Sequence, residues 1–262
     1  RTYSAVTLLV IIHRTHVKYP YLTSCEATPK QLLWAVVAFM LIAVVMGLAV
    51  FAIRGRAILI WAFAALIIGV SYSGGPLKLG FRGLGELAIF IMFGPLMMTG
   101  VYYAVTGTLD WKILWLSAAV GLLVTNIVYS HSVLDSVPDR KMGKKTMAHL
   151  MGSDRGQIVF SAILNTFPYL MTVAAVALGQ LHSAYLAVLL VLPLSLWLVK
   201  SLDDFVNHRE VPIEPKVWMG PMGDFQAYRK AGVDWFLLRW LTARNIVMMF
   251  CVIIIVVNLI FR

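Results

Sequence analysis

The order of apolar and polar residues divides the chain into long hydrophobic runs separated by polar connections. Seven runs are each about 20 residues long, the length that an α-helix needs to cross a hydrocarbon core about 30 Å thick. They predict membrane-spanning helices at 31–53, 56–73, 86–106, 111–130, 157–179, 183–200 and 243–261. Another apolar stretch, at 5–12, is too short to cross. The short alternating segments of a β-barrel are absent from the sequence, so we expect an all-α, polytopic transmembrane bundle.

Composition and charge agree with an integral membrane protein. The chain is 60% hydrophobic and 13% charged, with a mean hydropathy of +0.83. The chain has a net charge of +10, and its positive charges are unevenly distributed, because most of the 22 lysines and arginines lie in alternate loops. The remaining loops and the C-terminus hold only Arg54, Arg56, Lys112 and Arg262, with Arg1 unassigned. The positive-inside rule then predicts cytoplasmic basic loops and an outer C-terminus, in what we take to be a bacterial plasma membrane, and nucleic-acid binding is not expected.

The connections indicate one membrane domain over residues 1–262, whose N-terminal part we expect to be incomplete because the chain starts with Arg1. The long connections all lie on the basic side, so a functional site is expected there. The longest, 201–242, is predicted to be a cytoplasmic amphipathic loop. Its last part, DWFLLRW, carries Trp235, Phe236 and Trp240, which suit the lipid headgroup level.

A cluster of charges stands directly after a predicted span, in LDSVPDRKMGKKTMAHLMG at 134–152. Asp135 and Asp139 are four residues apart, and cations follow at once: Arg140, Lys141, Lys144 and Lys145. Charges at a membrane boundary are costly, which favours a functional role. The structural alternative is a solvated helix start capped by Asp135, with Pro138 in its first turn and the cations serving topology.

Two segments resemble the UbiA superfamily of membrane prenyltransferases, most closely the branch that prenylates dihydroxynaphthoate in menaquinone synthesis. The segment SYSGGPLKLGFRGLGELAIFIMFGPL at 71–96 resembles the phrase YTGPPxxLGYRGLGE with its FFGPL-like helix, and a Tyr102–Tyr103 pair follows. The segment 134–152 resembles RDIExDRxxGKRTLAVRLG, with matches at Asp135, Asp139, Arg140, Gly143, Lys144, Thr146 and Gly152. The similarity covers roughly residues 20–200. The family fold has nine helices, and the seven predicted spans correspond to its third to ninth.

The resemblance implies Mg²⁺-dependent transfer of a polyprenyl group from its diphosphate to a small aromatic acceptor such as dihydroxynaphthoate. It implies that Asp135 and Asp139 are the catalytic metal ligands, because Mg²⁺ prefers carboxylate oxygens together with substrate phosphates. Arg140 and Lys144 would bind the diphosphate. Tyr72, Lys78 and Arg82 would line the acceptor side, although an interfacial aromatic and inside charges are expected at such positions in any case. The partners implied are the two substrates and membrane lipids.

The chain also departs from the family pattern. A first acidic motif, broadly NDxxDxxxD, should precede SCEATPKQLLW, but IIHRTHVKYPYLTS contains no Asp, so no residue inherits that role. The two remaining carboxylates can hold one Mg²⁺ rather than two. Glu86 is interpreted as a helix-opening residue that favours the positive end of the helix dipole, and neither His131 nor His149 is expected to be a ligand.

Two alternatives to an enzyme remain from the sequence. The chain could be a non-catalytic relative that binds lipid, quinone or pigment as a subunit of a larger membrane complex. That hypothesis accounts for the missing first motif but not for the preserved second one. A transporter is less consistent with the sequence, because it has almost no charge within its spans and no repeated pair of broken helices.

Overall fold

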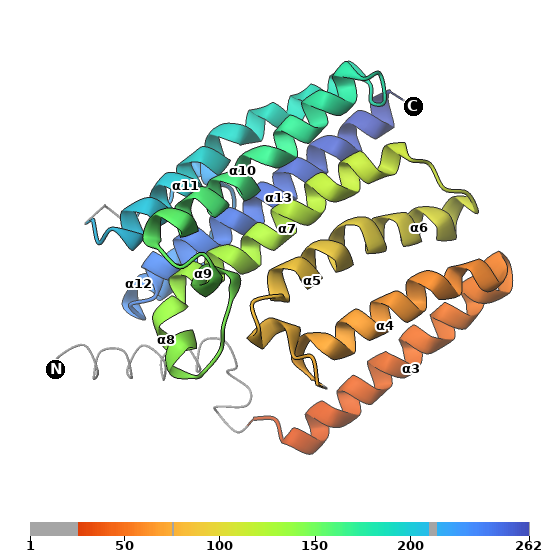
Figure 1. The fold of residues 1–262 in the computed structure, drawn as a ribbon, viewed down its shortest axis with the longest axis horizontal. Helices are drawn as coiled ribbons and strands as arrows, with labels where there is room; N and C mark the ends of the chain where they lie inside the picture. Colours follow the sequence, from red (N-terminus) through yellow and green to blue (C-terminus); the bar gives the residue numbers. More distant parts are fainter. Residues whose placement is uncertain (1–25, 75, 210–213, 262) are drawn as a thin grey trace.

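The computed structural model describes residues 26–74, 76–209 and 214–261 as a bundle of helices joined by loops (Figure 1). No β-sheet is present among these residues, which form a single isolated bridge pair. Within the described ranges, six segments are long and apolar enough to cross a membrane. The predicted all-α, polytopic bundle is therefore confirmed.

The described elements are, in chain order, α3 (Pro29–Arg54), η1 (Gly55–Ile58), α4 (Leu59–Ser73), η2 (Leu79–Phe81), α5 (Gly85–Ile91), η3 (Met92–Leu96), α6 (Met97–Thr106), α7 (Lys112–Leu134), α8 (Ser136–Lys141), α9 (Met147–Leu150), α10 (Asp154–Ala177), η4 (Ser183–Val191), α11 (Leu192–Val206), η5 (Val217–Met219), α12 (Phe225–Lys230) and α13 (Asp234–Ile260).

The predicted spans correspond to these helices, although the observed bounds differ from the predicted ones, most of all at the start of α13, which begins at 234 instead of 243. The first spanning segment is 45 residues long because it includes α3, η1 and α4 together, although Gly55 at the junction has non-helical backbone angles, with φ of 71° and ψ of −159°. Figure 1 shows that α3 and α4 run in opposite directions, so they match the two spans predicted there. The segment DWFLLRW forms the first two turns of α13 instead of a separate amphipathic piece. Phe236 is only 4% exposed, so this side chain packs inside the protein, and the headgroup level of the segment stays a prediction.

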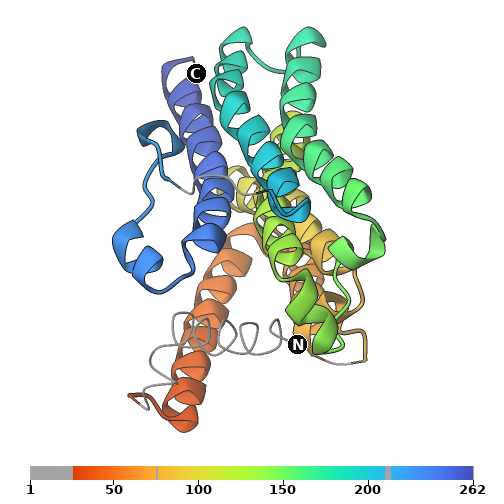
Figure 2. The same ribbon diagram turned by 90° about the vertical axis from the view of Figure 1, so that its left-hand side faces the viewer.

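Helix α7 lies in the middle of the bundle, packed against α5, η3, α10 and α13 (Figures 1 and 2). Most of the largest fully buried side chains come from α7, α10, α11 and α13, among them Leu123, Tyr129, Tyr169, Leu198, Leu202, Ile246 and Phe250. Helices α3 and α4 differ, because neither contains a buried residue, and α3 exposes long apolar side chains along its whole length. Such all-round apolar surface is what a lipid-facing helix requires.

The helix formed by α5, η3 and α6 is kinked where it crosses α7. Gly94 has non-helical backbone angles within the π-helical turn η3, and Pro95 follows it. Pro removes a backbone donor, which is a common cause of kinks. A Cβ atom built on Gly94 would lie 2.8 Å from the Cα of Gly121 on α7, so the two backbones touch. The crossing therefore requires glycine on both helices.

This crossing gives a prediction about stability. In Gly121→Ala, the new Cβ would lie 2.8 Å from the Gly94 Cα and 3.0 Å from the Phe90 carbonyl oxygen. Backbone atoms cannot rotate away, so we expect the variant to unfold more easily by about 1–3 kcal/mol. Gly47→Ala on α3 is the matched control, because its Cβ would meet nothing within 4 Å. Thermal unfolding in one detergent compares the two, and equal melting temperatures would contradict the close crossing.

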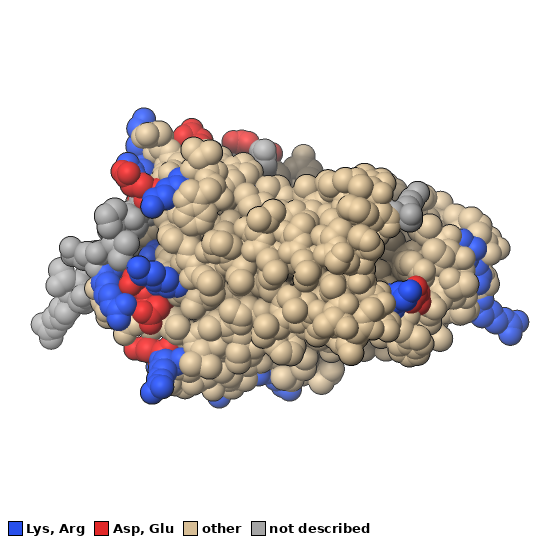
Figure 3. Space-filling view, turned by 90° about the horizontal axis from the view of Figure 1, so that it is seen from above, with Lys and Arg blue, Asp and Glu red and all other residues tan. Residues whose placement is uncertain are grey.

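Charged side chains gather at the two ends of the bundle, with an apolar surface between them (Figure 3). The more densely charged end carries α8, α9 and α12. The opposite end carries η1 and the connection from α6 to α7. The apolar middle surface is long enough to face the hydrocarbon core of a bilayer.

Candidate active site

The two segments that carry the family resemblance meet at the densely charged end. The Lys145 amide donates to the carbonyl of Phe81 at 3.0 Å, and the Gly83 amide donates to the carbonyl of Lys145 at 2.9 Å. These bonds form a short parallel bridge between Arg82 and Lys145. Backbone pairing thus joins loops that lie about 60 residues apart in the sequence. We call residues 142–147, which contribute one side of this pairing, the basic strap.

Asp135 and Asp139 are buried at the end of α7. Asp135 stands between α7 and α8 and is 6% exposed, and Asp139 on α8 is 4% exposed. The Asp135 side chain makes no capping hydrogen bond at the start of α8. The alternative of a solvated helix start with an Asp135 cap is therefore wrong, because both carboxylates are turned into the protein.

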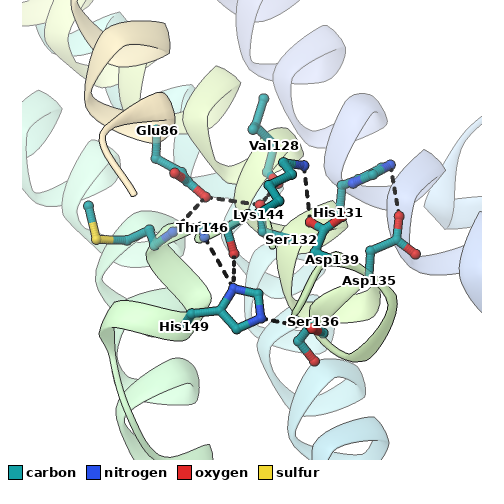
Figure 4. A network of polar contacts seen from close by, with 11 residues as sticks. Glu86, Val128, His131, Ser132, Asp135, Ser136, Asp139, Lys144, Thr146 and His149 are labelled. Carbon is teal, nitrogen blue, oxygen red and sulfur yellow. Dashed lines mark hydrogen bonds and ion pairs between the residues drawn. The ribbon is translucent and has the colours of Figure 1, made fainter. Parts of the chain in front are cut away.

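Each carboxylate has a basic side chain beside it (Figure 4). The Nζ of Lys144 lies 3.0 Å from Oδ2 of Asp139, and Nε2 of His131 lies 3.2 Å from Oδ2 of Asp135. The His131 ring also packs edge-on against Phe236 of α13, with 5.3 Å between ring centroids. The Asp139 amide donates to the Asp135 carbonyl at 2.9 Å, so the two residues lie one helical turn apart, each with its own basic partner.

A basic pocket adjoins this pair. Its volume is about 290 Å³, and it is lined by Arg140, Gly143, Lys144, Lys145, His149 and Leu150. Lys144 lines the pocket and also bonds to Asp139, so it connects the basic pocket to the acidic pair. Arg140 and Lys145 are exposed and available to an anion from outside. The arrangement places cationic donors next to carboxylates, as recognition of a metal-bound phosphate group requires.

The residues predicted for the acceptor side lie along the first loop. Tyr72 ends α4, half-buried, and its ring would be 3.5 Å from a Cβ on Gly80. Lys78 adopts a left-handed backbone conformation with φ of 43° and is exposed, as is Arg82. The structure therefore brings the backbone of Arg82 to the basic strap, whereas the side chains of Lys78 and Arg82 extend from the surface.

Two residues of this site have roles that the sequence interpretation missed. Glu86 does open α5, as predicted, but its side chain is also buried and accepts hydrogen bonds from α7 and α9. His149 fixes the start of α9, because its Nδ1 accepts from the Thr146 amide at 3.1 Å. Its Nε2 therefore carries the proton and donates to the Ser136 carbonyl at 2.8 Å. No signal in the sequence indicated these contacts, because a glutamate at a helix start is already favoured by the helix dipole.

The donor set fits one Mg²⁺ held jointly with a substrate. Among the described residues, no group of three or more His, Cys, Asp or Glu side chains forms a self-sufficient metal cage. Mg²⁺ is commonly held by one or two carboxylates plus phosphate oxygens, which Asp135 and Asp139 can provide. Asp139 already forms an ion pair with the Lys144 ammonium. The stretch in which the first acidic motif was expected, within 11–24, lies outside the described residues.

These features define a class of protein: a polytopic helical membrane protein with a buried acidic pair and a basic pocket at one end of its bundle. The sequence profile of the UbiA prenyltransferase family matches residues 13–210. The chain belongs to this family, and the predicted resemblance is confirmed.

Curated relatives have related names. The chain is 28% identical over 183 residues to a 2-carboxy-1,4-naphthoquinone phytyltransferase of Synechocystis, covering 69% of this chain and 59% of the relative. It is 31% identical over 139 residues to a 1,4-dihydroxy-2-naphthoate octaprenyltransferase of Mycobacterium tuberculosis, covering 53% and 47%. An enzyme of the same name from Bacillus subtilis is 28% identical over 191 residues, covering 73% and 60%. The chain thus spans between 47% and 60% of these relatives. No solved structure matches it.

Proposed function

We propose that the protein transfers a polyprenyl group from prenyl diphosphate to a small aromatic acceptor such as dihydroxynaphthoate, in quinone biosynthesis. The observation that carries the proposal is the buried Asp135–Asp139 pair beside the Lys144 ammonium, where the two family segments converge. The names of the relatives support a naphthoate acceptor. The whole of residues 1–262 would act as one transferase domain.

The reaction breaks the allylic carbon–oxygen bond, and its electron pair leaves with the diphosphate. A new bond forms between the prenyl carbon and a ring carbon of the acceptor, and that ring carbon releases its proton to water, or CO₂ where it carries the carboxylate, so that the ring regains its aromaticity. Bound Mg²⁺ would supply positive charge to the leaving diphosphate, held by Asp135 and Asp139. Lys144 and Arg140 would donate to the remaining phosphate oxygens from the basic pocket. Tyr72, Lys78 and Arg82, which lie at and after the end of α4, would shape the acceptor side.

An apolar groove offers room for the prenyl tail. It has a volume of about 800 Å³ and lies between α3, α4 and the kinked helix, with a lining that includes Val44, Phe51, Trp61 and Leu96. Met92 at its edge follows Glu86 by six residues, about 9 Å along a helix. A tail in this groove would keep its reactive end near the polar site and away from water, which would otherwise quench an allylic cation.

We place the site at the cytoplasmic face of a bacterial plasma membrane, with the C-terminus outside. This orientation is supported by the excess of Lys and Arg in the loops at the densely charged end. The alternative of a non-catalytic subunit in a larger complex is not favoured by the relatives, which are named as transferases.

A reconstituted transfer assay tests the function. Purified protein in lipid nanodiscs, given prenyl diphosphate, 1,4-dihydroxy-2-naphthoate and Mg²⁺, should form a prenylated product. We expect excess EDTA to lower turnover by at least about 100-fold, because the leaving group then lacks its charge partner, and added Mg²⁺ to restore it. Full turnover in EDTA would contradict the metal role. A lack of product with prenyl chains of every length tried would contradict the function.

A further inference from the structure

The Glu86 carboxylate is buried more completely than its place at a helix start requires. Its exposed fraction is 3%, yet it belongs to the first turn of α5, at the polar end of the bundle. A carboxylate removed from water is costly unless it is hydrogen-bonded. The helix dipole favours a carboxylate at this end but demands neither burial nor contacts with other helices. The burial therefore has another cause.

That cause is a pair of hydrogen bonds to two other elements, drawn in Figure 4. Oε1 of Glu86 accepts from the hydroxyl group of Ser132 at 2.9 Å and from the backbone amide of Met147 at 3.2 Å. Ser132 belongs to α7, and Met147 is the first residue of α9. One oxygen thus connects three segments that are far apart in the sequence.

Both donors lie close to the acidic pair along the chain. Ser132 precedes Asp135 by three residues at the end of α7, and Met147 follows Lys144 by three residues at the end of the basic strap. Lys144 in turn holds Asp139 at 3.0 Å. Figure 4 shows Lys144 between Glu86 on one side and the two aspartates on the other. Glu86 therefore sits where it can set how far the strap lies from the end of α7.

We propose that Glu86 is a positioning residue of the transfer site, a role that rests on the proposed function. Its carboxylate fixes the basic strap against α7, so that Lys144 and the aspartates are in place before a diphosphate arrives. Preorganised groups stabilise a leaving group without first having to rearrange. Glu86 itself would not touch the diphosphate, because an anion facing an anion is unfavourable without a metal between them.

Variants at Glu86 distinguish the role of its side-chain oxygen as a hydrogen-bond acceptor from the role of its negative charge. In Glu86→Gln the amide oxygen can accept both hydrogen bonds at the same chain length, so we expect transfer to stay within about threefold of wild type. Glu86→Leu removes the acceptor, and we expect kcat to fall about 10- to 100-fold through misplacement of Lys144. Ser132→Ala removes one of the two hydrogen bonds, so its kcat should lie between those of Glu86→Gln and Glu86→Leu. Glu214→Leu, at an exposed carboxylate paired with Arg229, is the matched control and should resemble wild type.

Hydrogen–deuterium exchange of the Met147 amide gives a second readout that does not depend on turnover. It should be faster than wild type in Glu86→Leu and near wild type in Glu86→Gln and Glu214→Leu. Ser132→Ala covers the case in which Glu86→Leu does not fold, because it changes only one small side chain. Its expected result is a partial loss of kcat with faster exchange at Met147.

Three results would overturn the inference. Wild-type turnover together with wild-type exchange in Glu86→Leu or Ser132→Ala would show that the bonds position nothing. A Glu86→Gln variant that loses as much transfer as Asp139→Asn, with normal exchange, would make the charge essential and indicate a metal ligand instead. If active wild-type protein exchanges the Met147 amide as fast as Glu86→Leu does, the bond is absent in solution. By contrast, wild-type protein without any turnover but with the expected exchange pattern would reject the proposed function and retain the contact.

Discussion

Asp139→Asn is expected to lower prenyl transfer by at least about 100-fold, while the protein still folds and inserts into membranes. Asn has the size of Asp and can still accept the Lys144 hydrogen bond through its amide oxygen, so the packing around α8 is kept. What it loses is the negative charge that would hold Mg²⁺. Asp135→Asn removes the neighbouring charge and should have a similar effect.

Transfer assays on the two variants should be read together with melting temperatures in the same detergent. The matched control is Asp203→Asn, because Asp203 is also an ion-paired aspartate near a helix end, 2.8 Å from Arg209. It lies on α11, outside the proposed site, and its transfer rate should resemble that of wild type. Wild-type turnover in Asp135→Asn or Asp139→Asn would remove that residue from the metal role. A large fall in melting temperature would instead indicate that the buried charge serves the fold.

The spans were predictable because a bilayer of fixed thickness demands apolar runs of fixed length. The start of α13 could not be predicted in the same way, because it contains charged residues. Asp234 and Arg239 lower the hydropathy of the DWFLLRW turns, which then resemble an interfacial loop. In the structure Arg239 is 5% exposed and donates to the carbonyl groups of Ser201 and Trp235. A hydropathy value includes the charge of a residue, but it contains no information about the backbone acceptors that its own and a neighbouring helix supply.

The candidate site could be predicted in its parts but not in its assembly. The family phrases indicate Asp135, Asp139 and Lys144 because these residues follow one another in the same order as in the family motif. The pairing of Gly83 with Lys145 and the contacts of Glu86 depend on how α5, α7 and α9 pack, which no local pattern encodes. A glutamate at a helix start is satisfied by the dipole alone, so its sequence position gave no reason to look for partners.

Gly83→Val is expected to reduce transfer about 10- to 100-fold by pushing the first loop away from the basic strap. Gly83 has a φ of +78°, and a Cβ at this position would lie 2.3 Å from Cδ1 of Leu150. A β-branched residue would therefore be strained and would also collide with α9. Because the Gly83 amide bonds to the Lys145 carbonyl, the displacement would reach Lys144 and its contact with Asp139. The steady-state rate of transfer by the purified variant measures the loss.

Three alanine variants separate the collision from the backbone strain. Gly83→Ala has both, whereas the double variant Gly83→Ala with Leu150→Ala keeps only the strain, about 1–2 kcal/mol for a left-handed residue. Gly179→Ala has a similar φ of +66° with nothing within 4 Å of the new Cβ, and it lies after α10, away from the basic strap. All three should lose stability, but only Gly83→Ala should lose much of its transfer rate. If the double variant is as inactive as Gly83→Ala, the left-handed turn matters more to the site than the contact with α9. If Gly83→Ala retains the wild-type rate, the exposed Leu150 side chain has rotated away from the new Cβ, and the contact of Gly83 with Leu150 does not position the basic strap.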